Sequence, residues 1–136
     1  MLNRAVLQKL AMMRLNDARA LLRARRYAGA YYIAGYVVEC GLKSCIARQT
    51  RRFEFPDRKR TIESYTHDLN ILVNLAGIDL RTRREKDEDF NKNWIVVSDW
   101  SEQSRYNTIS RELARDLVRA IAEPHHGVLQ WLQDHW

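Results

Sequence analysis

The chain has 136 residues, of which 46% are hydrophobic and 29% charged. This length fits one domain, and this composition excludes a disordered or fibrous chain. Five glycines and two prolines provide few of the turns that an all-β fold needs, so helices are favoured. The formal charge of +6 suits a polyanionic partner such as RNA without identifying one. We expect one all-α domain over residues 1–136.

The N-terminal segment does not resemble a signal peptide, because three basic residues interrupt the apolar positions of its first 14 residues. The longest apolar stretch, residues 27–47, is nearly long enough to span a membrane. It contains Glu39 and Lys43, however, and charges are costly in lipid. We interpret the stretch as a buried helix and expect no membrane association.

The two cysteines, Cys40 and Cys45, lie five residues apart on one predicted helix. Their side chains point to different sides of that helix, so they cannot form a disulfide bond with each other. No other cysteine offers the spacing of a zinc site, and the adjacent His125 and His126 are poorly placed to bind one ion. We expect a cytoplasmic protein with neither a metal nor a cofactor.

Two long helices are predicted first, over residues 3–25 and 28–49. The first is amphipathic, with apolar residues at spacings of three and four: Leu7, Ala11, Leu15, Ala18 and Leu22. The second is apolar on most sides, which indicates a central element surrounded by neighbours. The short connection between them favours an antiparallel hairpin.

A polar segment over residues 50–66 follows, in which Pro56 would stop a helix. A third helix is predicted over residues 67–76, capped by Thr66 or Asp68 and ended by Gly77. Either His67 or Asp68 could cap this helix, and a metal or catalytic pair is the alternative. Residues 78–87 are interpreted as a polar connection rich in arginine.

A fourth helix is predicted over residues 86–99, followed by a loop over 101–108. Ser110 is a plausible cap for a fifth helix over residues 111–122. Its inward side chains are expected to be Leu113, Leu117, Ala120 and Ile121. Because proline is favoured in the first turn of a helix, a last short helix is expected to start at Pro124 and reach Asp134.

The second predicted helix also carries a recognisable pattern of residues. The pattern consists of Ala30, Tyr31, Tyr32, Ala34, Gly35, Tyr36, Glu39, Leu42 and Lys43. It resembles the signature helix of HEPN domains, which are small helical-bundle proteins. Three further pieces resemble the same family: the Arg26-Tyr27 step, residues 66–78, and Ser104-Arg105-Tyr106 with the helical segment after it.

This resemblance implies an all-α, antiparallel up-and-down bundle of four to six helices. Many HEPN members are metal-independent ribonucleases that act as homodimers, including toxins neutralised by a nucleotidyltransferase-like antitoxin. Others lack the catalytic motif and act as binding modules. The resemblance therefore implies an RNA-cleaving homodimer, and the alternative is a non-catalytic module that binds a nucleotide, nucleic acid or a nucleotidyltransferase-like protein.

The nuclease members carry an arginine, then four to six residues, then a histidine. Histidine suits proton transfer near neutral pH, and arginine suits a phosphate on which charge develops. Arg119 followed by His125 or His126 fits this spacing near the C-terminal end, where the family keeps its motif. These three residues are our catalytic candidates, although Pro124 interrupts the segment and a surface arginine with two loop histidines is the alternative.

Two other arginines test the same motif. Arg60 and His67 have the required spacing, but they span a loop and a helix start rather than the expected place. Arg105 lies in the family-like Ser-Arg-Tyr segment, yet no histidine follows it at that spacing, which counts against nuclease activity.

Residues 48–60 contain six basic residues and two acidic ones. A solvated loop is one interpretation, and a nucleic-acid contact is the other. Our RNA-binding candidates are Arg51, Arg52, Arg58, Arg60 and Arg105. Within the apolar helix, Glu39 needs a partner because buried carboxylates must be paired or neutral. Lys43, one turn later, or a tyrosine hydroxyl is the expected partner, and a ligand or dimer cleft is the alternative.

Overall fold

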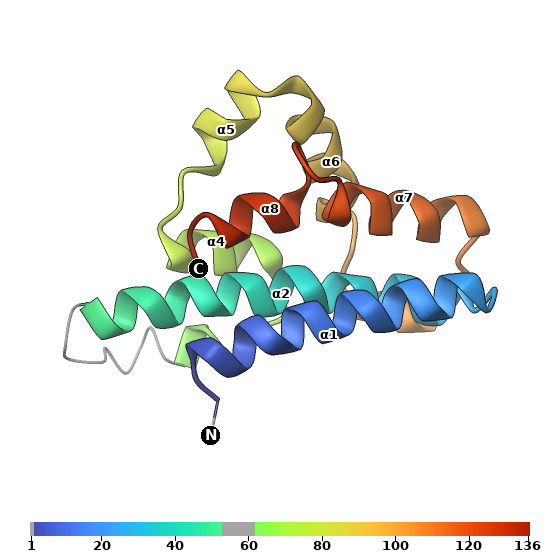
Figure 1. Cartoon of the computed structure of the whole chain (residues 1–136), viewed down its shortest axis with the longest axis horizontal. Helices are drawn as coiled ribbons and strands as arrows, with labels where there is room; N and C mark the ends of the chain where they lie inside the picture. Colours follow the sequence, from blue (N-terminus) through green and yellow to red (C-terminus); the bar gives the residue numbers. More distant parts are fainter. Residues whose placement is uncertain (1, 53–61) are drawn as a thin grey trace.

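The computed structural model describes residues 2–52 and 62–136, without the side chains of residues 51 and 52. Within these ranges every regular element is helical (Figure 1). The α-helices are α1 (Arg4–Arg23), α2 (Tyr27–Arg52), α4 (Leu69–Ala76), α5 (Leu80–Lys86), α6 (Glu88–Ser98), α7 (Arg111–Ala122) and α8 (Val128–Gln133), and η1 (Glu102–Tyr106) is a short 3₁₀-helix. The all-α prediction is confirmed, and the described ranges hold more helices than the expected four to six.

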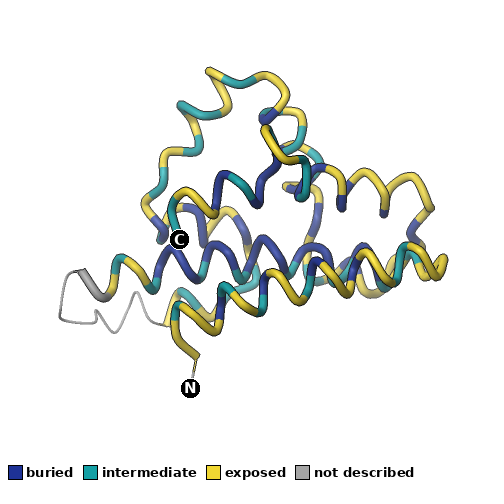
Figure 2. Tube along the Cα trace, viewed as in Figure 1, coloured by how far each residue is buried: buried dark blue, intermediate teal, exposed yellow. Residues whose placement is uncertain are grey.

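Helix α2 is the central element, as its apolar sequence predicted. It packs against α1, α4, α7, α8 and η1. Helix α1 runs antiparallel along one side of α2, whereas α7 and α8 cover the opposite side (Figure 1). The buried residues of α2 gather towards these neighbours, and the outer face of α1 is largely exposed (Figure 2). No described helix combines the length and the apolarity needed to cross a membrane.

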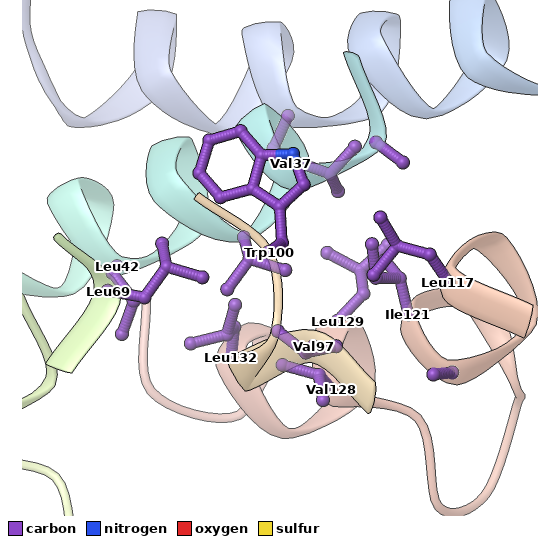
Figure 3. Close-up of a cluster of buried hydrophobic side chains, with 14 of the residues drawn as sticks. Val37, Leu42, Leu69, Val97, Trp100, Leu117, Ile121, Val128, Leu129 and Leu132 are labelled. Carbon is purple, nitrogen blue, oxygen red and sulfur yellow. The ribbon is translucent and has the colours of Figure 1, made fainter. Parts of the chain in front are cut away.

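The core lies between α2 and the C-terminal helices. Trp100, just after α6, belongs to one buried cluster with side chains of α2, α7 and α8 (Figure 3). The labelled members of the cluster include Val37, Leu42, Leu117, Ile121, Val128, Leu129 and Leu132. Gly35 allows the indole of Trp100 to lie against the backbone of α2, because any Cβ there would overlap the ring. The small residues of α2 thus allow close approach of its neighbours.

The predicted caps of two helices are confirmed, whereas α1 is shorter than the expected 3–25 because Asn3 caps it by accepting a hydrogen bond from the Val6 amide. Asp68 caps α4 by accepting hydrogen bonds from the amides of Asn70 and Ile71, and Gly77 ends the helix with φ 65°. Ser110 caps α7, as expected from the sequence.

Residues 78–87, expected to be a connection, form helix α5 instead. The Asp79 carboxylate accepts a hydrogen bond from the Thr82 amide and starts α5, whereas Asp87 ends α5 and caps α6. Neither aspartate was recognised as a cap, because the run of arginines resembled a solvated loop. Residues 102–106, expected to be a loop, form η1.

Two expectations near the C-terminal end of the sequence were wrong. The last helix begins at Val128 rather than Pro124, because residues 124–126 form a turn. In this turn the Glu123 carboxylate accepts hydrogen bonds from the amides of His125 and His126. Leu113 is exposed, since it lies in the first turn of α7 outside the buried stripe of Ala114, Leu117, Val118 and Ile121.

Candidate functional site

A buried carboxylate lies at the centre of the main polar cluster. Glu39 is 4% exposed and contacts both Lys43 and His67. The Lys43 ammonium lies 3.4 Å from Glu39 Oε2, which agrees with the predicted pair. His67 Nδ1 lies 2.6 Å from Glu39 Oε1. The second contact was missed because nothing in the sequence relates positions 28 residues apart.

The cluster draws its side chains from α2, the start of α4 and η1. We call it the His67 cluster and define it as Tyr32, Tyr36, Glu39, Lys43, His67, Glu102 and Arg105. The four residues from α2 follow each other at spacings of four, three and four, so they share one face of the helix. His67 directly precedes Asp68, the cap of α4, and this position directs its ring towards Glu39.

Two tyrosines form one wall of the cluster. The hydroxyls of Tyr32 and Tyr36 lie 2.9 Å apart. The Tyr36 ring contacts the rings of His67 and Trp100 edge to face, with centroids 5.9 Å and 5.5 Å away. Burial, together with the neighbouring Tyr32 hydroxyl, raises the pKa of Tyr36 above its ordinary value of 10.0. Tyr36 therefore remains neutral and keeps its proton at physiological pH.

Arg105 lies at the exposed side of the cluster. Its guanidinium contacts Glu102 Oε1 at 3.3 Å and lies over the ring of Tyr106. Hydrogen bonding to Tyr106 and Tyr32 raises the pKa of Arg105, which keeps its positive charge fixed. Glu102 also faces His67, with Oε2 3.8 Å from Nε2, a separation longer than a hydrogen bond.

The His67 ring is 40% exposed, so its Nε2 edge is within reach of a ligand. If Nδ1 carries the proton, it donates to Glu39 and leaves Nε2 free to accept a proton. A carboxylate behind an imidazole fixes both its orientation and its tautomer. The arrangement thus combines an oriented imidazole with a permanent cation, Arg105, and both face Glu102.

The three catalytic candidates from the sequence occupy a different place. Arg119 is exposed on α7, and His125 and His126 lie in the turn between α7 and α8. Within the described ranges, no hydrogen bond or ion pair joins the Arg119 side chain to either histidine. The His126 ring instead contacts Asp87, with Nδ1 2.8 Å from Oδ2.

The Asp87–His126 pair connects the corner between α5 and α6 to the turn before α8. The hydrogen bond to Asp87 raises the pKa of His126. Burial alone would raise the pKa of Asp87, but the bonds from His126 and the Phe90 amide lower it overall. Arg83 also contacts Asp87 at 3.3 Å, so this carboxylate already has two basic partners.

The arginines predicted to bind RNA are only partly described. Arg58 and Arg60 lie outside the described residues, and so do the side chains of Arg51 and Arg52, whose backbone belongs to the end of α2. Arg105 is therefore the RNA-binding candidate whose surroundings are known, and it belongs to the His67 cluster. Glu102 was not singled out from the sequence.

Both cysteines are free, with Cys40 half-buried and Cys45 buried. Burial raises the pKa of Cys45 to about 12, which keeps its thiol protonated. Across residues 2–52 and 62–136, no group of three His, Cys, Asp or Glu side chains is placed to hold a metal ion.

Comparisons of the chain with protein-family models, curated proteins and solved structures find no match.

Proposed function

We propose that this chain is a HEPN-type protein that cleaves RNA without a metal ion, with the His67 cluster as its acid–base site. The observation that carries the proposal is the 2.6 Å contact between His67 Nδ1 and the buried carboxylate of Glu39. A partly exposed imidazole held in this way is suited to accept a proton.

The resemblance to HEPN domains supports the same site. The segments that carry the resemblance lie far apart in the sequence, and three of them contribute to one cluster. The signature helix contributes Glu39 and Lys43, the segment over residues 66–78 contributes His67, and the Ser-Arg-Tyr segment contributes Arg105. Structural packing alone does not require these segments to meet through ionisable groups.

In the proposed reaction, His67 Nε2 accepts the proton of a ribose 2′-hydroxyl. The 2′ oxygen then attacks the adjacent phosphorus, and the bond from phosphorus to the 5′ oxygen breaks. The 5′ oxygen takes a proton from water, and the hydroxide so formed takes the proton held by His67, which leaves a 2′,3′-cyclic phosphate, a 5′-hydroxyl and a neutral imidazole. Arg105 would donate hydrogen bonds to the non-bridging oxygens, where negative charge builds up. Glu39 would stabilise the imidazolium that forms on His67.

RNA cleavage by the purified chain in EDTA tests this proposal. His67→Asn retains a side chain that can donate to Glu39 but cannot act as the base. We expect it to lower the cleavage rate by about 10²–10⁴-fold. The triple variant Arg119→Ala/His125→Ala/His126→Ala serves as the comparison and should cleave at nearly the wild-type rate. The reverse pattern would reject the His67 cluster and assign the reaction to the Arg119 motif.

The alternative function is a non-catalytic module that binds a nucleotide, nucleic acid or a nucleotidyltransferase-like protein. It is favoured by the internal pairing of the cluster, since Lys43 and His67 contact Glu39 and Arg105 contacts Glu102. Such pairing also suits a cluster that only connects α2, α4 and η1. If neither wild type nor variants cleave RNA, this alternative replaces the nuclease proposal.

The proposal includes a homodimer, as the resemblance to HEPN ribonucleases implies, and a nucleotidyltransferase-like antitoxin as a partner. Light scattering of the purified chain would measure its mass in solution. A mass twice that of the chain would agree with the proposal, and a monomer that still cleaves RNA would remove the dimer from it.

A further inference from the structure

A second candidate site lies at the end of the bundle where α1 ends and where α2 and α7 begin (Figure 1). It is an open pocket of about 320 Å³. Its lining consists of Leu22, Arg23, Arg25, Tyr27, Arg111 and Arg115. We call it the arginine pocket. Four of its six lining residues are arginines, and none is acidic.

The arginine pocket lacks counter-charges. Within the described part of the chain, none of the four guanidinium groups forms a hydrogen bond or an ion pair with another residue. Six other basic side chains each contact a carboxylate: Arg14, Lys43, Arg81, Arg83, Lys92 and Arg105. The chain thus pairs many of its bases internally but leaves these four available to a ligand.

Three elements bring the arginines together. Arg111 and Arg115 lie one turn apart on α7, so they share a face of that helix. Arg23 ends α1, and Arg25 lies in the turn before α2. The N-terminal end of α7 adds partial positive charge of its own. The four positive charges that line this pocket repel one another, and an anion bound between them would relieve the repulsion.

Arg25 has a φ of 60°, a backbone conformation that favours glycine. The backbone of Arg25 is therefore strained, because a non-glycine residue is less stable in the left-handed conformation. Glycine at position 25 would suit the turn better but would remove one of the four cations. This makes Arg25→Gly a substitution that removes the charge without damaging the turn.

We propose that the arginine pocket binds a phosphate group, carried either by a free nucleotide or by the end of an RNA strand. The planar guanidinium fork matches phosphate oxygens in a bidentate manner. The volume exceeds that of one phosphate, so the group attached to it can enter as well. Leu22 and Tyr27 provide the less polar part of the lining for this attached group.

This site has no lining residue in common with the His67 cluster, whose nearest member on α2 is Tyr32, and it lies away from the Glu39–His67 pair. Tyr27 and Glu39 are 12 residues apart on α2, which corresponds to about 18 Å along the helix axis. The inference therefore does not depend on catalysis by His67. His67→Asn should leave binding at the arginine pocket unchanged, whatever its effect on RNA cleavage.

Calorimetric titration at low salt tests the proposal with four probes. They are ADP, adenosine, a 5′-phosphorylated RNA tetranucleotide with methylated 2′ oxygens, which cannot be cleaved, and the same tetranucleotide with a 5′-hydroxyl. We expect a phosphorylated probe to bind more tightly than its unphosphorylated twin. Arg25→Gly/Arg115→Ala should weaken that binding by about tenfold or more, since charge-assisted bonds are lost. Preference for ADP would identify a free nucleotide as the source of the phosphate, and preference for the tetranucleotide would identify RNA.

The matched control is Arg81→Ala/Lys92→Ala, which removes the same net charge from exposed positions on α5 and α6. It should change affinity little. An equal loss in both double variants would overturn the proposal, because binding would then reflect net charge alone. Binding of none of the phosphorylated probes, or equal binding of the unphosphorylated twins, would overturn it too. Thermal melting of each variant confirms that the fold is retained.

Discussion

The indole of Trp100 lies directly against the α2 backbone at Gly35, in a space that no side chain at position 35 could share. Trp100 is buried, and its ring also contacts Tyr36 edge to face. Because Trp100 comes just after α6 and before η1, this contact fixes the segment that carries Glu102 and Arg105 beside α2. A structural contact in the core thus positions one side of the His67 cluster.

Gly35→Ala is expected to destabilise the protein. Alanine has the higher helix propensity, by about 1 kcal/mol, but overlap with a buried ring outweighs this gain. We expect a net loss of about 1–3 kcal/mol in the free energy of unfolding, measured by urea denaturation. Gly29→Ala is the control in the same helix, since its Cβ would lie 3.5 Å from Leu21, an ordinary contact. If both variants gain stability, the close approach of Trp100 does not exist in solution.

Glu39 should interact more strongly with His67 than with Lys43. The relevant contacts are 2.6 Å and 3.4 Å, and the shorter one is a well-formed charge-assisted hydrogen bond when His67 is protonated. Double-mutant cycles with Glu39→Gln, His67→Leu and Lys43→Met measure the two coupling energies, since leucine cannot donate to Glu39. We expect about 1–2 kcal/mol for the first pair and about 0.5 kcal/mol for the second. A larger coupling to Lys43 would mean that His67 is not held by Glu39.

Stability should fall with rising pH because of His126. Its pKa is raised above the ordinary 6.5 by Asp87, and Glu123 and Asp89 act in the same direction. The stabilisation is therefore fully present below pH 6.5 and is lost as the pH rises through the folded-state pKa. Urea denaturation between pH 5.5 and 9 should show a free energy of unfolding that decreases with pH in the wild type. The decrease should be smaller in His126→Gln.

Asp87 contributes at the opposite end of the pH range. Its folded-state pKa is lowered from 3.8, so its stabilisation is present above that pH and is lost as the pH falls through the folded-state value. Asp87→Asn keeps an oxygen that accepts from the Phe90 amide, so α6 remains capped. It should nevertheless reduce the decrease in the free energy of unfolding above pH 6.5, as His126→Gln does. If the decrease persists in both variants, it is caused by another titrating group.

Arg25→Gly should leave the free energy of unfolding unchanged or raise it by up to about 1.5 kcal/mol. Relief of the positive φ contributes about 1–2 kcal/mol, and the greater freedom of glycine in the unfolded chain offsets about 0.5–1 kcal/mol of it. Ala24→Gly, at the neighbouring position with φ −81°, lacks the first contribution and should be destabilising. Equal losses in the two variants would contradict the left-handed conformation of Arg25.

The sequence patterns predicted the framework of the fold well, and for local reasons. The apolar spacing of α1, the nearly uniform apolarity of α2 and the caps at Asp68, Gly77 and Ser110 each act within a few residues. Helix α5 was missed because arginine-rich composition suggested solvent, although Asp79 three residues before Thr82 is a cap signal. Pro124 was overinterpreted, since proline suits a turn as well as the start of a helix.

The candidate site was predictable only in part. The Glu39–Lys43 pair follows from a spacing of four on one helix. The contact between Glu39 and His67 depends on how α4 packs against α2, which no local pattern encodes. The arginine pocket likewise joins residues 22–27 to residues 111–115 through tertiary packing. The spacing between Arg119 and the two histidines describes only their separation along the chain. It does not determine whether their side chains meet in the folded protein.

Helix α5 has no buried residue and packs mainly against α6, at a distance from α2 (Figure 2). Within α5, Leu80 packs partly buried against the core, and Arg83 stacks over the Phe90 ring and donates to the His125 carbonyl. Asp87, the cap that follows α5, contacts His126. Such a segment opens at much lower free energy than the core. Its amide protons should exchange with deuterated solvent long before those of α2, and faster still once His126 has lost its charge.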